Sequence, residues 1–352
     1  MSGSNVFDNE NVIHGGDVYR NKVVLDYSVN LNPMPLPEAV ETAAREGLAG
    51  MHQYPDPLHQ KLREAIAGYE DVDAANVLCG SGASELILAA CHAFRPRRAL
   101  VTAPCYAGYS YALDAVDAEV TEYTLDESKG FALDEGFLDC ITSGTDMVFI
   151  ADPNNPDGRL TDRDLKQRIA GRCKSKGVVL VIDECFLPLT GRGLDDHGTC
   201  GSALHLRAFT KTFAIPGIRA GYMISADTAR LEAVQRHLPE WNMSCIAERV
   251  GEAAAGVLRD TDYLENSLEL IDKERKFLAG EIAGLGIKVY DSDTNFLLIR
   301  SDSGLYDRLL ERGILIRRCA NFSGLDDTYY RLAVRDHEDN IRLVGALCEC
   351  LR

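Results

Sequence analysis

Residues 178–184 read VVLVIDE, an apolar run closed by two acidic residues. A strand of this composition is apolar on both faces, so we expect it to be buried on both sides. Similar short runs stand at 76–80, 98–104, 146–153, 205–211 and 220–225. Helical patterns lie between most of them, and this alternation predicts a three-layer α/β fold with a mostly parallel sheet. Only a tight turn separates the last two runs, so one strand can run antiparallel.

A chain of 352 residues is long enough for two domains. After about residue 240 the pattern changes to a long helical region that is followed by short strand patterns. We therefore expect an N-terminal arm at 1–35, a large domain at 36–240 and a smaller α+β domain at 241–352.

The chain carries a formal net charge of -17 at pH 7. This charge disfavours binding to nucleic acid or to an anionic membrane surface, because both of these partners are themselves anionic. No apolar run approaches the roughly 20 residues of a membrane-spanning helix, and the N-terminal residues lack the pattern of a signal peptide. We therefore expect a cytoplasmic protein with a small-molecule partner, which local cations must hold if it is anionic.

The eleven cysteines show no C-x-x-C spacing, and no histidine cluster accompanies them. This pattern predicts reduced, mostly buried thiols rather than disulfides or a metal site.

Chemically distinctive residues stand where the predicted strands end. In an open α/β sheet, ligands bind at the carboxyl ends of the strands. These ends are Gly80-Ser81-Gly82, Ala103-Pro104, Asp152 to Asn155, Asp183-Glu184 and Thr210-Lys211. A glycine turn, an amide, a carboxylate and a lysine should therefore converge on one crevice.

Two of these features predict an anion site. The turn GSGASE (80–85) opens a helix, so free N–H groups near Ala83 and Ser84 can bind a phosphate. Taken alone, this turn is better explained as a tight strand-to-helix turn with a serine that caps the helix. Arg219 follows an Ile-Pro-Gly turn, and with Thr210 it can hold the other side of the phosphate.

Beside such an anion site, Lys211 and Asp183 are candidates for catalysis and for cofactor binding. A lysine that is partly desolvated near other cations loses its proton and attacks carbonyl groups. A buried carboxylate such as Asp183 needs a cationic partner, for which a protonated pyridine nitrogen is suitable. Asn155 can bond the phenolic oxygen of such a ring, and Tyr106 can stack on its face. The combination predicts pyridoxal phosphate, although a solvated lysine and a structural aspartate remain the simpler readings of each residue alone.

The blocks GSGASE, PCYAGY, DPNNPDG, VIDE and TKTFAIPGIRAGY resemble, in this order, the fold type I pyridoxal-phosphate enzymes of the class II aminotransferase group. The resemblance makes Lys211 the Schiff-base lysine and Asp183 the partner of the pyridinium nitrogen. Asn155 and Tyr106 match the residues that contact the ring, while Ala83, Ser84, Thr210 and Arg219 match those that bind its phosphate. Tyr54, in QYPDP, matches a tyrosine that reaches the cofactor phosphate of the neighbouring subunit, which implies a homodimer. Asp157 replaces the threonine of the family's Asn-Pro-Thr-Gly, and we expect it to alter only the turn.

Two kinds of enzyme within this group fit the sequence. His14-Gly15-Gly16, Phe186 in place of a tyrosine, and the tract ILIRRCANFSGLDDTYYRLAVR (314–335) are similar to the decarboxylases that act on L-threonine O-3-phosphate in cobalamin biosynthesis. By this resemblance Arg331 grips the substrate carboxylate, and Arg317 binds the distal phosphate with His14 and Asn30. Of Arg317 and Arg318, only one can point inward from a strand, and the motif selects Arg317.

Three alternatives stay open. The chain can be an aminotransferase of the histidinol-phosphate type, or a decarboxylase of serine phosphate instead of threonine phosphate. A non-catalytic binding module with this fold is less compatible with the intact Lys211.

Overall fold

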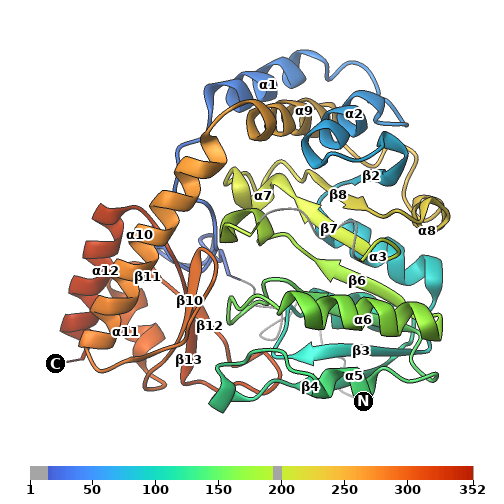
Figure 1. Ribbon diagram of the computed structural model, residues 1–352. Coiled ribbons are helices and arrows are strands. Elements are labelled where there is room, and N and C mark those ends of the chain that lie inside the picture. Colours follow the sequence, from blue (N-terminus) through green and yellow to red (C-terminus); the bar gives the residue numbers. More distant parts are fainter. Residues whose placement is uncertain (1–14, 193–199, 352) are drawn as a thin grey trace, which may run out of the picture.

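The computed structural model describes residues 15–192 and 200–351, and a seven-stranded sheet forms its centre (Figure 1). The strands follow the order β2 (Val77–Gly80), β8 (Gly221–Ile224), β7 (Leu204–Ala208), β6 (Val179–Asp183), β5 (Met147–Ala151), β3 (Arg98–Ala103) and β4 (Glu119–Thr124). β8 pairs antiparallel with both of its neighbours, and all other pairs are parallel. The predicted mostly parallel sheet and its one antiparallel strand are confirmed.

The sequence patterns missed β4, whose residues read EVTEYT. This strand lies at the edge of the sheet and pairs only with β3. Its side chains are exposed or half-buried, so the strand carries none of the continuous apolar character by which the central strands were found.

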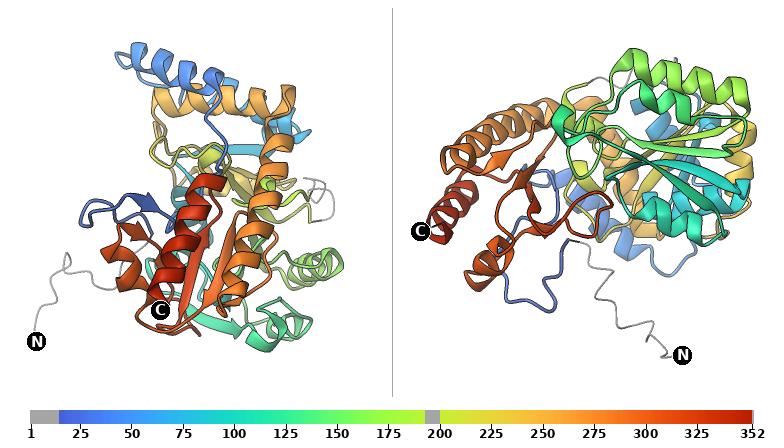
Figure 2. Two further views of the ribbon diagram at one scale, coloured as in Figure 1. Left: turned by 90° about the vertical axis from the view of Figure 1, so that its left-hand side faces the viewer. Right: turned by 90° about the horizontal axis from the view of Figure 1, so that it is seen from below.

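Helices cover both faces of the sheet, as the right panel of Figure 2 shows. One face packs against α3 (Ala83–Phe94), α4 (Gly108–Asp114) and α8 (Thr228–Gln235). The other face packs against α5 (Gly136–Cys140) and α6 (Arg163–Lys176). At the β2–β8 end of the sheet, α1 (Glu38–Ala49), α2 (Gln60–Glu70) and α9 (Cys245–Asp260) enclose a further apolar core. These layers establish the predicted three-layer α/β class.

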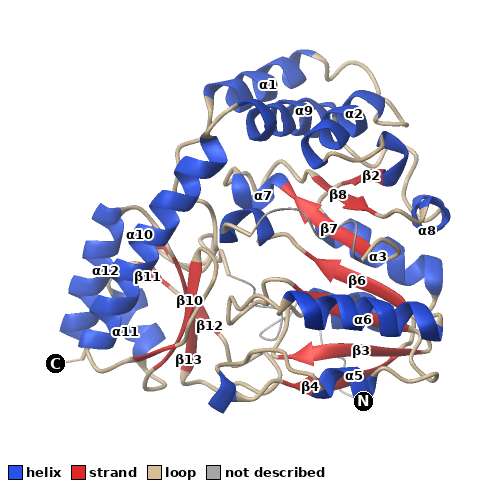
Figure 3. Cartoon of the chain, viewed as in Figure 1, coloured by secondary structure: helices blue, strands red, loops and turns tan. Residues whose placement is uncertain are grey.

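A second, smaller sheet lies beside the first (Figure 3). Its antiparallel strands follow the order β12 (Arg317–Arg318), β13 (Tyr329–Ala333), β10 (Phe296–Arg300) and β9 (Lys288–Val289). The helices α10 (Tyr263–Gly284), α11 (Leu305–Glu311) and α12 (His337–Cys350) share its core. β1 (Leu25–Asp26) pairs in parallel with β11 (Ile314–Leu315), so the N-terminal segment is attached to this smaller unit.

Short elements complete the chain. They are the 3-10 helices η1 (Ala74–Asn76), η2 (Glu127–Lys129) and η3 (Leu187–Thr190), and the one-turn helix α7 (Phe209–Thr212). The predicted division into residues 1–35, 36–240 and 241–352 stays a prediction. The packing of α9 against α1 and α2 favours counting residues 245–260 with the large domain.

Among the described residues, no helix combines the length and the apolar character needed to cross a membrane. The same residues contain no group of three side chains placed to hold a metal ion. Of the eleven cysteines, five are buried and six are half-buried, so fewer of them are buried than the sequence led us to expect.

Candidate functional site

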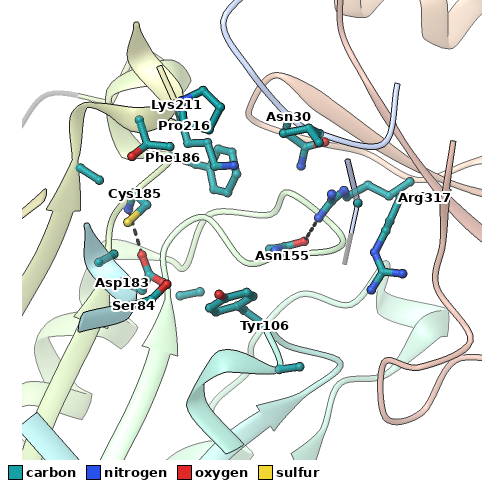
Figure 4. Close-up of a pocket in the computed structure, with 18 of the residues that line it drawn as sticks. Asn30, Ser84, Tyr106, Asn155, Asp183, Cys185, Phe186, Lys211, Pro216 and Arg317 are labelled. Atoms are coloured by element: carbon teal, nitrogen blue, oxygen red, sulfur yellow. Dashed lines mark hydrogen bonds between the residues drawn. The ribbon is translucent and has the colours of Figure 1, made fainter. Parts of the chain in front are cut away.

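The carboxyl ends of β5, β6 and β7, the start of α3 and the strands β12 and β13 surround a cavity of about 340 Å³ (Figure 4). All of the predicted cofactor residues except Tyr54 line it. They are Ala83, Ser84, Tyr106, Asn155, Asp183, Thr210, Lys211 and Arg219. The predicted substrate residues Asn30, Arg317 and Arg331 also line it. His14 lies outside the described residues. Tyr54 is 80% exposed and does not line the cavity of its own chain.

Lys211 lies on α7, directly after β7 ends, and its amine faces the cavity. Burial lowers the pKa of Lys211 to about 8, and the positive charges of Arg331 and Arg219 act in the same direction, against Cys185 and Asp183. The Nζ atom lies 5.4 Å from the centre of the Phe186 ring. A large share of this amine is therefore neutral slightly above neutral pH, which is the form that attacks a carbonyl group.

Asp183 ends β6 and is held from two sides. Its Oδ2 accepts a hydrogen bond from the Tyr109 hydroxyl at 2.7 Å, and its Oδ1 accepts one from the Cys185 backbone N–H at 3.0 Å. Burial raises the pKa of Asp183 above its ordinary value. A cation placed against this carboxylate, such as a protonated pyridine nitrogen, would offset that burial.

The start of α3 has the geometry expected of an anion site. Gly82 takes a φ of +80°, and a Cβ atom there would lie 2.5 Å from Nη2 of Arg219, so only glycine allows this close approach. No carboxylate oxygen of the described residues lies within the 4.0 Å ion-pair distance of the Arg219 guanidinium. The N–H groups at the start of the helix and this cation are therefore available to the same phosphate.

Arg317 and Arg331 are directly opposite each other on β12 and β13, so both side chains leave the sheet on the same face. Both are buried, and neither has a carboxylate partner among residues 15–192 and 200–351. Burial lowers the pKa of Arg331 to about 10 and also lowers that of Arg317. Arg318 instead points outward and pairs with Asp307 at 3.1 Å, so of these two neighbouring arginines it is Arg317 that lines the cavity.

The two guanidiniums are held mainly by neutral groups. Arg331 donates to the Asn155 side-chain oxygen and to the Ser28 carbonyl oxygen at 2.8 Å. Arg317 donates to the Arg318 carbonyl oxygen at 2.6 Å and to Oδ1 of Asn321 at 2.8 Å. Two like charges opposite each other destabilise a sheet unless they are compensated. The pair therefore suits a ligand that brings two anionic groups.

Several residues of the site were not identified from the sequence. Tyr109, Cys185, Ser28, Asn321 and Phe322 line the cavity or hold its residues. Asn321 and Phe322 lie within the tract 314–335, so proximity to Arg317 in sequence was a usable signal for them. Asn30, by contrast, was predicted. It is buried, and neither side-chain polar atom bonds another described residue, which leaves both available to a ligand.

Comparison with known proteins gives one consistent family. The sequence profile described as aminotransferase class I and II matches residues 22–347. The chain is 34% identical over 352 residues to the threonine-phosphate decarboxylase of Salmonella typhimurium, with 96% of each chain covered. It is 32% identical to the histidinol-phosphate aminotransferase of Methanothermobacter thermautotrophicus, covering 94% of this chain and 89% of the relative. The crystal structure of the histidinol-phosphate aminotransferase from Clostridium acetobutylicum superposes with a TM-score of 0.86 at 32% identity, covering 93% of this chain and 99% of that one.

Proposed function

Because the chain belongs to the aminotransferase class I and II family and has pyridoxal phosphate as its cofactor, we propose that it decarboxylates L-threonine O-3-phosphate. The products are (R)-1-amino-2-propanol O-2-phosphate and carbon dioxide. On the resemblance alone, we place this reaction in cobalamin synthesis.

The observation that carries this proposal is the opposed pair of buried guanidiniums, Arg317 and Arg331, which lack carboxylate partners among the described residues. Threonine phosphate brings a carboxylate and a phosphate on one small molecule. An arginine fork binds either group through two parallel hydrogen bonds. One substrate can therefore neutralise both charges at the same time.

The residues present fit the cofactor. Lys211 offers an amine with a lowered pKa, Asp183 a buried carboxylate that lacks a cation, and Gly82 with Arg219 a phosphate cradle. When bound, pyridoxal phosphate supplies an electron-withdrawing ring that accepts the electrons of the bond broken at the substrate Cα. Asp183 would keep a proton on the ring nitrogen, and the Asn155 side-chain amide can donate to the ring oxygen.

The protein side chains then have separate tasks. Arg331 binds the carboxylate that leaves as carbon dioxide, and Arg317 holds the phosphate that stays on the product. Lys211 delivers the proton that replaces the carboxylate at Cα, so one C–C bond breaks and one C–H bond forms. Phe186 and Phe322, both buried in the cavity wall, limit the access of water to this carbon.

Transamination of histidinol phosphate is the second candidate, and the similarity to aminotransferases of that type favours it. Histidinol phosphate carries one anionic group and leaves one guanidinium without a partner. The acceptor 2-oxoglutarate, however, would engage both through its two carboxylates. Phe186 weighs against this candidate, because the aminotransferases usually place a tyrosine there whose hydroxyl contacts the cofactor.

A single-substrate experiment separates the two reactions. With threonine phosphate alone, we expect catalytic release of carbon dioxide while the visible absorbance of the enzyme returns after each turnover. With histidinol phosphate alone, we expect no lasting change. A stoichiometric loss of the visible band with histidinol phosphate, restored by 2-oxoglutarate, would contradict the decarboxylase proposal.

Arg317→Gln is expected to remove the preference for phosphorylated substrates. A hydrogen bond to a charged group contributes about 1.5–3 kcal/mol, so kcat/KM for threonine phosphate should fall about 10- to 100-fold. Activity on unphosphorylated threonine should change little. Arg318→Gln is the matched control, because that side chain pairs with Asp307 at the surface. Equal losses on both substrates in Arg317→Gln would exclude a role in phosphate binding.

We also propose that two copies of the chain form a homodimer in the cytoplasm, in which Tyr54 reaches the neighbouring cofactor phosphate. Tyr54 is 80% exposed, and its ring lies 4.7 Å from that of Trp241. Met51 and Leu58, which lie near Tyr54 in the sequence, are also 66% and 59% exposed. A monomer in sedimentation equilibrium would contradict the dimer.

A further inference from the structure

Asp157 is a buried acid in the loop that follows β5. Its side chain is fully buried, and it stands where the family pattern has a threonine. Oδ1 accepts a hydrogen bond from the Arg159 backbone N–H at 2.9 Å, and Oδ2 accepts one from the Asn154 side-chain amide. Burial without a paired cation is costly for a carboxylate, so this residue needs a reason beyond the shape of the turn.

Asn154 connects Asp157 to a second loop. Its Nδ2 group donates both to Asp157 and, at 3.0 Å, to the carbonyl oxygen of Pro104 in the turn after β3. The amide is buried, and these two bonds use both of its hydrogens. Asn154 and Asp157 therefore link the turn after β3 to the loop after β5.

Each linked segment carries a residue of the cavity wall. Tyr106 stands two residues after Pro104, and Asn155 follows Asn154 directly; Figure 4 shows both side chains at the cavity. The far side of the Asn155 loop is held by the small domain, because the Asp293 N–H donates to the Gly158 oxygen at 2.9 Å. Asp293 also accepts from the Leu160 N–H at 2.9 Å. With that side fixed, the bridge through Asn154 sets the position of Asn155 relative to Tyr106.

We propose that Asn154 and ionised Asp157 form a positioning pair that sets Asn155 toward the ring oxygen of the cofactor and Tyr106 against the face of its ring. This inference rests on the cofactor of the family and not on the choice between decarboxylation and transamination. Both oxygens of Asp157 accept N–H groups, so a proton on Oδ2 competes with the bond from Asn154. If the amide turned to accept that proton, its oxygen would face the oxygen of Pro104, so a proton on Oδ2 weakens the bridge in either orientation.

The surroundings make this protonation accessible. Burial raises the pKa of Asp157 to about 7, while the Arg159 and Asn154 groups that face it act in the opposite direction. The Arg159 guanidinium is shared with Asp291 at 3.3 Å. From the turn after β3, the Cys105 thiol also faces Asp157, and burial raises its pKa to about 12, so it stays neutral. The bridge should therefore form as the pH rises through about 7.

The same shift has a consequence for stability. The folded pKa lies above the ordinary value of 3.8, so between these two values the folded protein binds a proton that the unfolded chain releases. The contribution of Asp157 to the free energy of unfolding therefore falls as the pH rises from about 4 to about 7. Asp157→Asn removes this contribution, and its amide imitates the protonated acid.

The test measures cofactor affinity without substrate, by titrating the apoenzyme with pyridoxal phosphate between about pH 5.5 and pH 8. We expect the Kd of Asp157→Asn to be about tenfold weaker than that of the natural protein at the upper end of this range. At the lower end the two Kd values should converge, because Asp157 of the natural protein is then protonated and resembles the asparagine of the variant. Asp157→Thr, whose hydroxyl oxygen can accept from Asn154, should match the affinity of the natural protein at the upper end and keep that affinity at the lower end, since it has no acid to protonate.

Asp291→Asn is the matched control, because it changes an acid that is 93% exposed beside the same loop. Its affinity should follow the natural protein at every pH. The apoenzyme melting temperature gives a second readout, in which Asp157→Asn should lack the decline with rising pH that Asp157 causes in the natural protein.

An unchanged Kd in Asp157→Asn, or a deficit of equal size at every pH, would overturn the inference. Should Asp157→Asn fail to fold, Asp157→Thr decides, since a pH response equal to that of the natural protein would exclude titration of Asp157. If the carbon dioxide assay failed, only the proposed substrate and reaction would be contradicted, because the cofactor titration contains no substrate.

Discussion

Lys211→Ala is expected to lower turnover by at least about 10³-fold, whichever substrate proves correct. Acid–base catalysis by a positioned side chain contributes about 10²- to 10⁴-fold, and this variant also loses the covalent attachment of the cofactor. The amine is placed for both tasks, because it faces the cavity and burial lowers its pKa to about 8. The measurement is kcat for carbon dioxide release, compared with Lys61→Ala on the exposed face of α2.

A chemical label tests the same assignment without turnover. Borohydride reduction of the cofactor-loaded natural protein should fix the cofactor on the peptide that contains Lys211. The variant should still bind pyridoxal phosphate through the phosphate cradle, but without a reducible bond. A label on any other lysine, or a Lys211→Ala protein with turnover equal to that of Lys61→Ala, would contradict the assignment.

The central fold could be predicted because its signal is local. The buried strands β5 and β6 are apolar on both faces, and each occupies a run that the sequence displays without reference to the rest of the chain. The edge strand β4 has no such run, since its residues reach solvent and its pairing with β3 depends on the sheet being present. Strand register is also non-local. That Arg317 lies opposite Arg331 follows from how β12 meets β13 across the intervening loop.

The residues of the site also divide into those that have a local signal in the sequence and those that do not. The rule that ligands bind at strand ends predicts that Asn155, Asp183 and Lys211 converge, and all three line the cavity. The Tyr109 hydroxyl that bonds Asp183 could not be predicted from that rule, because it projects from the helix α4 and not from a strand end. Asp157 was expected only to change a turn, whereas its carboxylate is bonded to Asn154 in the protein interior. Hydrogen bonds of this kind depend on three-dimensional proximity that sequence spacing does not encode.

Beneath the cavity, Arg207 forms the centre of a buried ionic cluster. Its guanidinium donates to Glu184 at 2.8 Å and also to Glu70, and all three side chains are buried. Burial alone would raise the pKa of Glu184, but Arg207, followed by His205 and Lys166, holds it below its ordinary value. Glu184 follows Asp183 directly, so this cluster supports the strand end that carries the site.

Arg207→Met is expected to lower the free energy of unfolding by about 3–5 kcal/mol, because it leaves two buried carboxylates without their guanidinium. The lowered pKa of Glu184 means that its ionised form stabilises the natural fold at neutral pH, and that this stabilisation is lost in acid. Without Arg207, burial should raise the pKa of Glu184, so the folded variant binds a proton more readily. The deficit should therefore be largest near pH 8 and smaller near about pH 5, where protonation relieves the buried charge.

Urea unfolding at both pH values measures this deficit. Arg342→Met is the matched control, because it removes an arginine of the same size from an exposed pair with Glu338. An exposed pair contributes at most about 1 kcal/mol, and its loss should depend little on pH. If Arg207→Met unfolded at the same urea concentration as Arg342→Met, the cluster would not stabilise the fold. A deficit of the same size at both pH values would instead exclude Glu184 as the group whose ionisation Arg207 supports.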